Sequence, residues 1–150
     1  MPALIGVDKF EQLFRQAADL DIDKSDLRRL NDFIQQKVYD LLLISQAVAR
    51  ANGRDIIEPW DIPITRGLQE SMNEFRFFEA NLEIRPILEQ LTPMPMLNCD
   101  YSEETRGKLP EIVGALTVSL AKTFKVLDPD LKNPRSEHWE QAFSIFNILL

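Results

Sequence analysis

The sequence predicts an all-α protein, and three observations support this prediction. Apolar residues recur at intervals of three and four over most of the chain, which is the spacing of one face of an α-helix. The helical segments follow the order short, long, short, and this order occurs twice. Ile56 and Ile57 suit no more than a brief strand-like bridge. No clean linker interrupts residues 7–91, so we expect one compact domain over residues 1–150.

The first half begins with a short helix within residues 7–20, followed by a loop over residues 19–25. Ser25 or Asp26 can cap the next helix, because both are residue types favoured at helix starts. That helix is expected over residues 26–52, roughly 40 Å long at about 1.5 Å per residue. A helix of this length needs a partner element of similar length to cover its apolar face.

The second half supplies such a partner in a helix over residues 103–127, capped by Ser102. Pro110 lies inside it and is expected to distort or shorten its first turns. One helical piece over residues 75–91 and a Pro-rich connector over residues 92–98 precede this long helix. In the helical piece over residues 75–91, the side chains of Phe75, Phe77 and Phe78 are expected in the core. An exposed Phe77 or Phe78 would instead indicate a partner surface.

The chain ends with a loop over residues 128–134 and a final helix that starts at Ser136. Four apolar positions of this helix share one face. They are Trp139, Phe143, Phe146 and either Leu149 or Leu150. Helical spacing of large apolar side chains predicts that this face is buried.

Residues 51–62 carry a helix stop, an extended piece and a new helix start. Gly53 suits a left-handed cap, since it has no Cβ to oppose that conformation. Pro59 suits the first turn of the next helix, with the acidic Asp61 near its positive end. Arg54 and Asp61 lie on either side of the loop, close enough to form an ion pair that fixes it.

This stretch, within the order short helix, long helix, short helix, resembles the histone fold. The whole chain is similar to a bacterial histone-fold doublet family of unknown function, DUF1931. The resemblance implies two histone folds in one chain, residues 1–74 and 75–150, which form an intramolecular pseudo-dimer around crossed long helices. It also implies that Arg54 and Asp61 form a structural ion pair.

The resemblance to DNA-binding archaeal histones allows their DNA contacts to be compared position by position. The first-loop position of a minor-groove arginine is Asp21 in this chain, and the Lys-Thr pair after Gly-Arg is Asp55-Ile56. A phosphate-facing basic position in the first helix is kept as Arg15. A carboxylate near a phosphate adds repulsion as well as losing a contact, so DNA binding does not follow from the fold.

The charge balance also disfavours DNA, because a formal net charge of -7 suits solubility better than phosphate binding. Acidic neighbours make Lys24, Arg28 and Arg29 a solvated mixed face, while Lys122 and Lys125 could form a patch with Lys132 and Arg135. The candidate DNA contacts are therefore Arg15, Arg28, Arg29, Lys122 and Lys125.

No catalytic or metal-binding pattern is visible in the sequence. His138 is the single histidine, is expected at the surface or as a helix cap, and rules out a multi-histidine site. Cys99 has no activating cation nearby in the sequence. Asp19, Asp21 and Asp23 alternate as in a calcium loop, but the required glycine and terminal glutamate are missing. We expect no enzyme activity and no cofactor.

These observations favour a non-enzymatic module that recruits protein, with self-association included. An architectural DNA-binding protein is the alternative. No apolar run approaches the ~20 residues that span a bilayer, so no membrane partner is expected. Residues 1–6 lack the pattern of a signal peptide, and the single cysteine fits a reducing cytoplasm.

Overall fold

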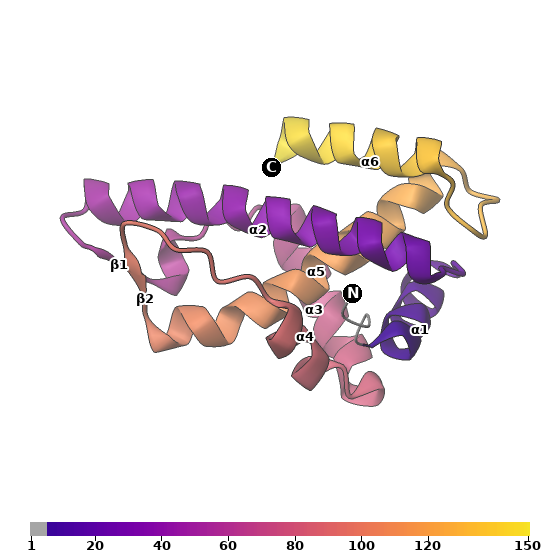
Figure 1. Cartoon of the computed structure of the whole chain (residues 1–150), viewed down its shortest axis with the longest axis horizontal. Coiled ribbons are helices and arrows are strands. Elements are labelled where there is room, and N and C mark those ends of the chain that lie inside the picture. The colour runs from indigo at the N-terminus through magenta and orange to yellow at the C-terminus, as the bar shows by residue number, and fades with distance from the viewer. Residues whose placement is uncertain (1–5) are drawn as a thin grey trace.

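The computed structural model describes residues 6–150, and the signal-peptide expectation therefore lies almost wholly outside the described residues. This part of the chain is mostly helical (Figure 1). Its elements are α1 (Val7–Ala18), α2 (Lys24–Ala51), β1 (Ile56–Ile57), the 3-10 helix η1 (Pro59–Asp61), α3 (Arg66–Leu82), α4 (Arg85–Leu91), β2 (Asp100–Tyr101), α5 (Glu103–Leu127) and α6 (Ser136–Leu149). Within residues 6–150, no helix is long and apolar enough to cross a membrane.

The start of α2 differs from the expectation that Ser25 or Asp26 caps it. Asp23 is the cap, and its carboxylate accepts hydrogen bonds from the backbone N–H groups of Ser25 and Asp26. The Asp26 carboxylate accepts from the Asp23 N–H in return, which completes a capping box. This reciprocal arrangement satisfies more backbone donors than a single Ser25 cap, so the helix starts earlier than predicted.

The region before the second long helix contains two helices where one was predicted over residues 75–91. α3 ends at Leu82, Glu83 has a left-handed backbone with φ 51, and α4 starts at Arg85. Pro86 lies in the first turn of α4, where its missing N–H is not needed. The expected boundary between residues 74 and 75 falls within α3. Pro59 opens only the short η1, and α3 begins at Arg66.

The two long helices have the predicted lengths, and they cross and contact each other (Figure 1). Pro110 does not shorten α5, which runs unbroken from Glu103 to Leu127. Residues 109–118 of α5 are all buried. This central segment is therefore covered on every side by other parts of the chain, and α1, α3, α4 and α6 all contact α5.

Two short strands join the loops that follow α2 and precede α5. β1 and β2 pair in parallel, with Ile56 opposite Asp100 and Ile57 opposite Tyr101. The strand-like bridge predicted at Ile56–Ile57 is thus confirmed, and its partner is β2. The connector between α4 and β2 is also fixed to α2, since the Gln46 side-chain oxygen accepts from the N–H groups of Asn98 and Cys99.

α6 packs against the N-terminal half of α2 through aromatic side chains. Phe33 stacks on Phe143 with ring centroids 5.6 Å apart and meets Phe146 edge-on at 4.9 Å. Trp139 is buried, as predicted, whereas Leu149 is 70% exposed and Leu150 is half-buried. α6 therefore leaves the C-terminal half of α2 uncovered on this side (Figure 1).

α3 approaches α5 closely because Gly114 has no side chain. A Cβ built on Gly114 would lie 2.4 Å from two ring carbons of Phe75, whose side chain is fully buried. Such a contact is shorter than carbon atoms tolerate, so the backbone or the ring would have to move. Gly114 thus sets the distance between these two helices.

We predict that Gly114→Ala destabilises the fold. The added methyl group overlaps the Phe75 ring, and overpacking of this kind costs about 1–3 kcal/mol. The free energy of unfolding from urea denaturation measures the effect. Gly107→Ala is the matched control on the same helix, because its Cβ would meet nothing within 4 Å. It should be neutral or gain up to about 1 kcal/mol from helix propensity. Equal losses in both variants would contradict this account.

Candidate functional site

The ion pair predicted in the loop after α2 is present and well formed. The Arg54 Nη1 and Nη2 atoms each lie 2.7 Å from one oxygen of the Asp61 carboxylate. Asp61 also accepts from the Glu58 N–H at 2.8 Å, and its side chain is fully buried. The hydrogen bond from Arg54 lowers the pKa of Asp61, and the same bond raises the pKa of Arg54.

This ion pair positions the strand that joins the two halves of the chain. Arg54 donates a further hydrogen bond to the Ile56 carbonyl, next to the paired segment. The Ile57 carbonyl accepts from the Ser102 N–H at 3.1 Å and from the Thr105 hydroxyl at 2.7 Å. The hydrogen bonds of the pair thus hold the loop between α2 and η1 in place beside the start of α5.

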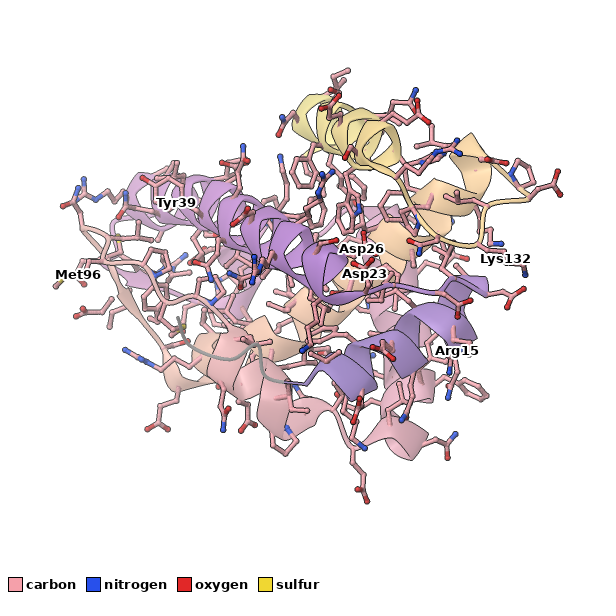
Figure 2. The ribbon with its side chains drawn as sticks, turned by 45° about the vertical axis from the view of Figure 1, so that its right-hand side comes forward. Arg15, Asp23, Asp26, Tyr39, Met96 and Lys132 are labelled. Carbon is pink, nitrogen blue, oxygen red and sulfur yellow. The ribbon has the colours of Figure 1, made fainter. Side chains whose placement is uncertain are left out.

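A second pair of loops meets at the opposite end of the molecule. The Asp21 N–H donates to the Lys132 carbonyl at 2.6 Å, which joins the loop after α1 to the loop after α5. The Lys132 side chain forms an ion pair with Asp19, and Arg15 pairs with Asp21 at 3.4 Å. Figure 2 shows Arg15 and Lys132 at this end and Met96 at the other. Local carboxylates thus neutralise the basic groups here.

Each candidate DNA contact has a partner within the chain. Arg29 donates to the Ser136 hydroxyl at 2.6 Å, and Arg28 also has an interaction. Lys122 pairs with Glu74 of α3 at 2.8 Å, while the Lys125 ammonium donates to the Leu131 carbonyl at 2.6 Å. Lys122 and Lys125 thus have different partners, and Lys125 lies with Lys132 near Asp19.

Asp26 has a role that the sequence reasoning missed, because its partner is distant in the chain. The buried Asp26 carboxylate accepts a hydrogen bond from the Trp139 indole N–H at 2.9 Å and thereby joins α2 to α6. Burial is the main cause of its raised pKa. His138 next to Trp139 is a helix cap, as predicted: its Nδ1 accepts from the Arg135 N–H at 3.0 Å, and the residue is buried.

An uncovered apolar stripe lies on the C-terminal half of α2. It consists of Tyr39, Leu43, Ile44 and Val48, which are 43%, 39%, 48% and 36% exposed. Tyr39 is labelled on this helix in Figure 2. Val48 was expected in the core. Tyr39 and Leu43 lie on one flank of the buried face of α2, and Ile44 and Val48 lie on the other, because residues four apart share a helix face. These apolar positions beside the core face were the signal available in the sequence. Phe77, predicted in the core, is 73% exposed on α3.

The described residues offer no cluster suited to hold a metal ion. No group of three or more His, Cys, Asp or Glu side chains within residues 6–150 is arranged for coordination. Cys99 is buried and unpaired. The features of the site are thus the fixed loops at both ends and the apolar stripe on α2.

The geometry defines an all-α chain in which two long crossed helices are joined by paired loops. The model of DUF1931, a domain of unknown function, matches residues 10–147, and the chain belongs to this family. It is 26% identical over 130 residues to an uncharacterized protein of Aquifex aeolicus, with 87% of this chain and 76% of that protein covered.

Two crystal structures are similar along the whole chain. A protein of Thermus thermophilus is 49% identical with a TM-score of 0.87, and the match covers 99% of this chain and 100% of that one. An Aquifex aeolicus protein is 25% identical with a TM-score of 0.85, and the match covers 100% and 99% of the two chains.

We predict that Arg54→Met lowers the free energy of unfolding by on the order of 2 kcal/mol at neutral pH. The change leaves the buried Asp61 carboxylate without its cation. Because the fold lowers the pKa of Asp61, the pair stabilises the protein at pH values above the ordinary pKa of an aspartate. This contribution disappears as the pH falls through the pKa of Asp61 in the folded protein. The free energies of unfolding of the parent and the variant should therefore become equal in acid.

The matched control for this change is Arg66→Met. Arg66 and Glu70 lie 3.7 Å apart and are both largely exposed, so their pair contributes little. Denaturation across a pH series compares the three proteins. A loss for Arg66→Met as large as that for Arg54→Met would show that burial of the pair is not the cause.

Proposed function

We propose that the chain consists of two histone folds that form an intramolecular pseudo-dimer. Support comes from the order of elements, since α1–α3 and α4–α6 each follow the order of the histone fold around a long central helix. The loop pairing also supports it. The second loop of the first half pairs with the first loop of the second half through β1 and β2. Asp21 and Lys132 make the reciprocal connection.

We propose that this pseudo-dimer is a non-enzymatic module for protein assembly. The observation that carries this proposal is the α2 stripe, whose four apolar side chains remain 36–48% exposed within residues 6–150. Exposed apolar side chains spaced one helical turn apart, such as Ile44 and Val48, are typical contacts for another protein. A cytoplasmic location belongs to the same proposal, because the free Cys99 fits a reducing compartment.

The charges support protein rather than DNA as the partner. Asp21 and Asp55 occupy the positions that resemble DNA contacts, and both side chains are exposed. Intrachain partners already engage the five candidate basic residues, so a phosphate would have to compete for them. With a net charge of -7, long-range steering also disfavours a polyanion.

Architectural DNA binding is the alternative, and one observation favours it. Arg15, Lys125 and Lys132 all lie near Asp19, where their charges contribute to its lowered pKa. They therefore gather at one pair of loops, with Arg28 and Arg29 in the first turns of α2. A phosphate could replace the exposed carboxylates there at modest cost, because exposed ion pairs contribute little.

We predict that the parent protein does not bind duplex DNA, even at low salt, because carboxylates occupy the contact positions. A titration at about 50 and 200 mM salt measures this, since binding by several phosphate contacts weakens by orders of magnitude over that range. The double variant Asp21→Arg with Asp55→Lys should gain salt-sensitive binding. A variant with the same charge change elsewhere, Glu89→Arg with Glu140→Lys, controls for net charge. Tight, salt-sensitive binding by the parent would favour the alternative.

We predict that Ile44→Glu prevents association through the α2 stripe without unfolding the protein. Ile44 is exposed, so the monomer loses little stability, whereas a buried carboxylate would oppose any partner. Sedimentation velocity tests self-association, and capture followed by reconstitution with the purified partner tests association with other proteins. Ile148→Glu, at an exposed apolar position on α6, is the matched control. Equal association by all three proteins would mean that the stripe is not the interface.

A further inference from the structure

A groove lies between the start of α3, the C-terminal half of α5 and the end of α6, and no residue of the α2 stripe lines it. Its volume is about 550 Å³. Pockets that bind small molecules enclose roughly 300–1,000 Å³ and are mostly apolar. The groove is therefore large enough for a small ligand, and the chemistry of its lining indicates which class of ligand fits.

Each hydroxyl group that lines the groove already takes part in at least one hydrogen bond within the chain. Ser119 donates to the Ser71 hydroxyl at 2.7 Å, and Thr123 donates to the Ser119 carbonyl at 2.7 Å. Thr65 accepts from the Leu68 N–H at 3.1 Å as the cap of α3. These groups therefore offer a polar ligand few new hydrogen bonds in exchange for those that it loses to water. The lining thus favours an aliphatic occupant.

The rest of the lining is aliphatic and aromatic and is open to solvent at its edge. Leu68 and Phe146 are buried at the groove, whereas Val126 and Leu149 are 81% and 70% exposed. An alkyl chain in this groove would remove these apolar side chains from water, and burial of apolar surface stabilises binding.

Lys122 is the single charged side chain among the residues that line the groove. Its ammonium lies 2.8 Å from a carboxylate oxygen of Glu74, and Glu74 is not part of the lining. The pair is 42% and 37% exposed, so it contributes little to stability. The Lys122 ammonium can therefore leave Glu74 and bind an anion in the groove, because the Glu74 carboxylate is not buried.

We propose that this groove binds a single-chain aliphatic carboxylate, of the fatty-acid class. The alkyl chain lies along the apolar walls, and the carboxylate accepts a hydrogen bond from Lys122. This inference does not depend on the proposed assembly function, which uses the stripe on α2. The anionic head follows from the sign of the one charged side chain that lines the groove, and the aliphatic chain follows from the apolar walls.

Calorimetric titration of the full chain with dodecanoate, kept below its micelle concentration, tests the proposal. We expect saturable binding of one molecule per chain. Gly67→Phe should abolish it, because Gly67 lines the groove and a Cβ there meets nothing within 4 Å, so the ring fills the space without disturbing the fold. Gly107→Phe is the matched control, since Gly107 is equally unobstructed and lies outside this groove.

Substitution of Lys122 distinguishes recognition of the dodecanoate carboxylate from adsorption of its alkyl chain alone. Lys122→Met should weaken dodecanoate binding about tenfold, as expected for loss of one charge-assisted hydrogen bond. Lys108→Met, on the same helix and outside the groove, should leave it unchanged. Dodecyltrimethylammonium, which has the same chain and the opposite charge, should bind the parent more weakly than dodecanoate does.

Three results would overturn the proposal. The first is the absence of saturable dodecanoate binding to the parent. The second is equal binding of the anionic and cationic amphiphiles, which would mean apolar adsorption only. The third is a parent protein that is dimeric, becomes monomeric in the Gly67→Phe variant and stays dimeric when dodecanoate is added. That result would mean that a second copy of the chain occupies the groove. Circular dichroism confirms that each variant is folded.

Discussion

Burial of the central part of α5 on every side is the constraint on which the rest of the structure depends. A helix whose residues 109–118 are all inaccessible needs several elements around it, and the chain supplies them from both halves. α1 and α3 cover it from the first half, and α4 and α6 from the second. Gly114 allows α3 to approach until the Phe75 ring touches the α5 backbone. Separation of the halves would expose this surface, so neither half has a complete core alone.

The polar interactions fix the ends of the molecule rather than create chemistry there. Arg54 and Asp61 bond to each other and to the backbone of the loop that leads into β1. At the other end, Asp19 and Asp21 neutralise Lys132 and Arg15. Because the charges at the ends are used internally, the surfaces left for recognition are the faces of the helices.

The placement of α6 accounts for both surfaces to which we assign binding. The ring of Phe33 lies between α2 and α6, and its contacts with Phe143 and Phe146 support α6 over the first half of α2 only. The second half of α2 therefore keeps its apolar stripe exposed. The end of α6 also stands away from α3 and leaves the apolar groove beside Lys122. One packing arrangement thus leaves both the α2 stripe and the apolar groove open to solvent.

The sequence by itself determined the helical class, the long helices, the left-handed Gly53, the bridge at Ile56–Ile57 and the pairing of Arg54 with Asp61. Each of these depends on local periodicity, on backbone preference or on residues a few positions apart. The tertiary structure alone decided the bond between Asp26 and Trp139, the exposure of Phe77 and Val48, and the partners of Lys122 and Lys125. These features depend on contacts between residues far apart in the chain, and a pattern of apolar positions cannot specify which of two apolar faces is covered.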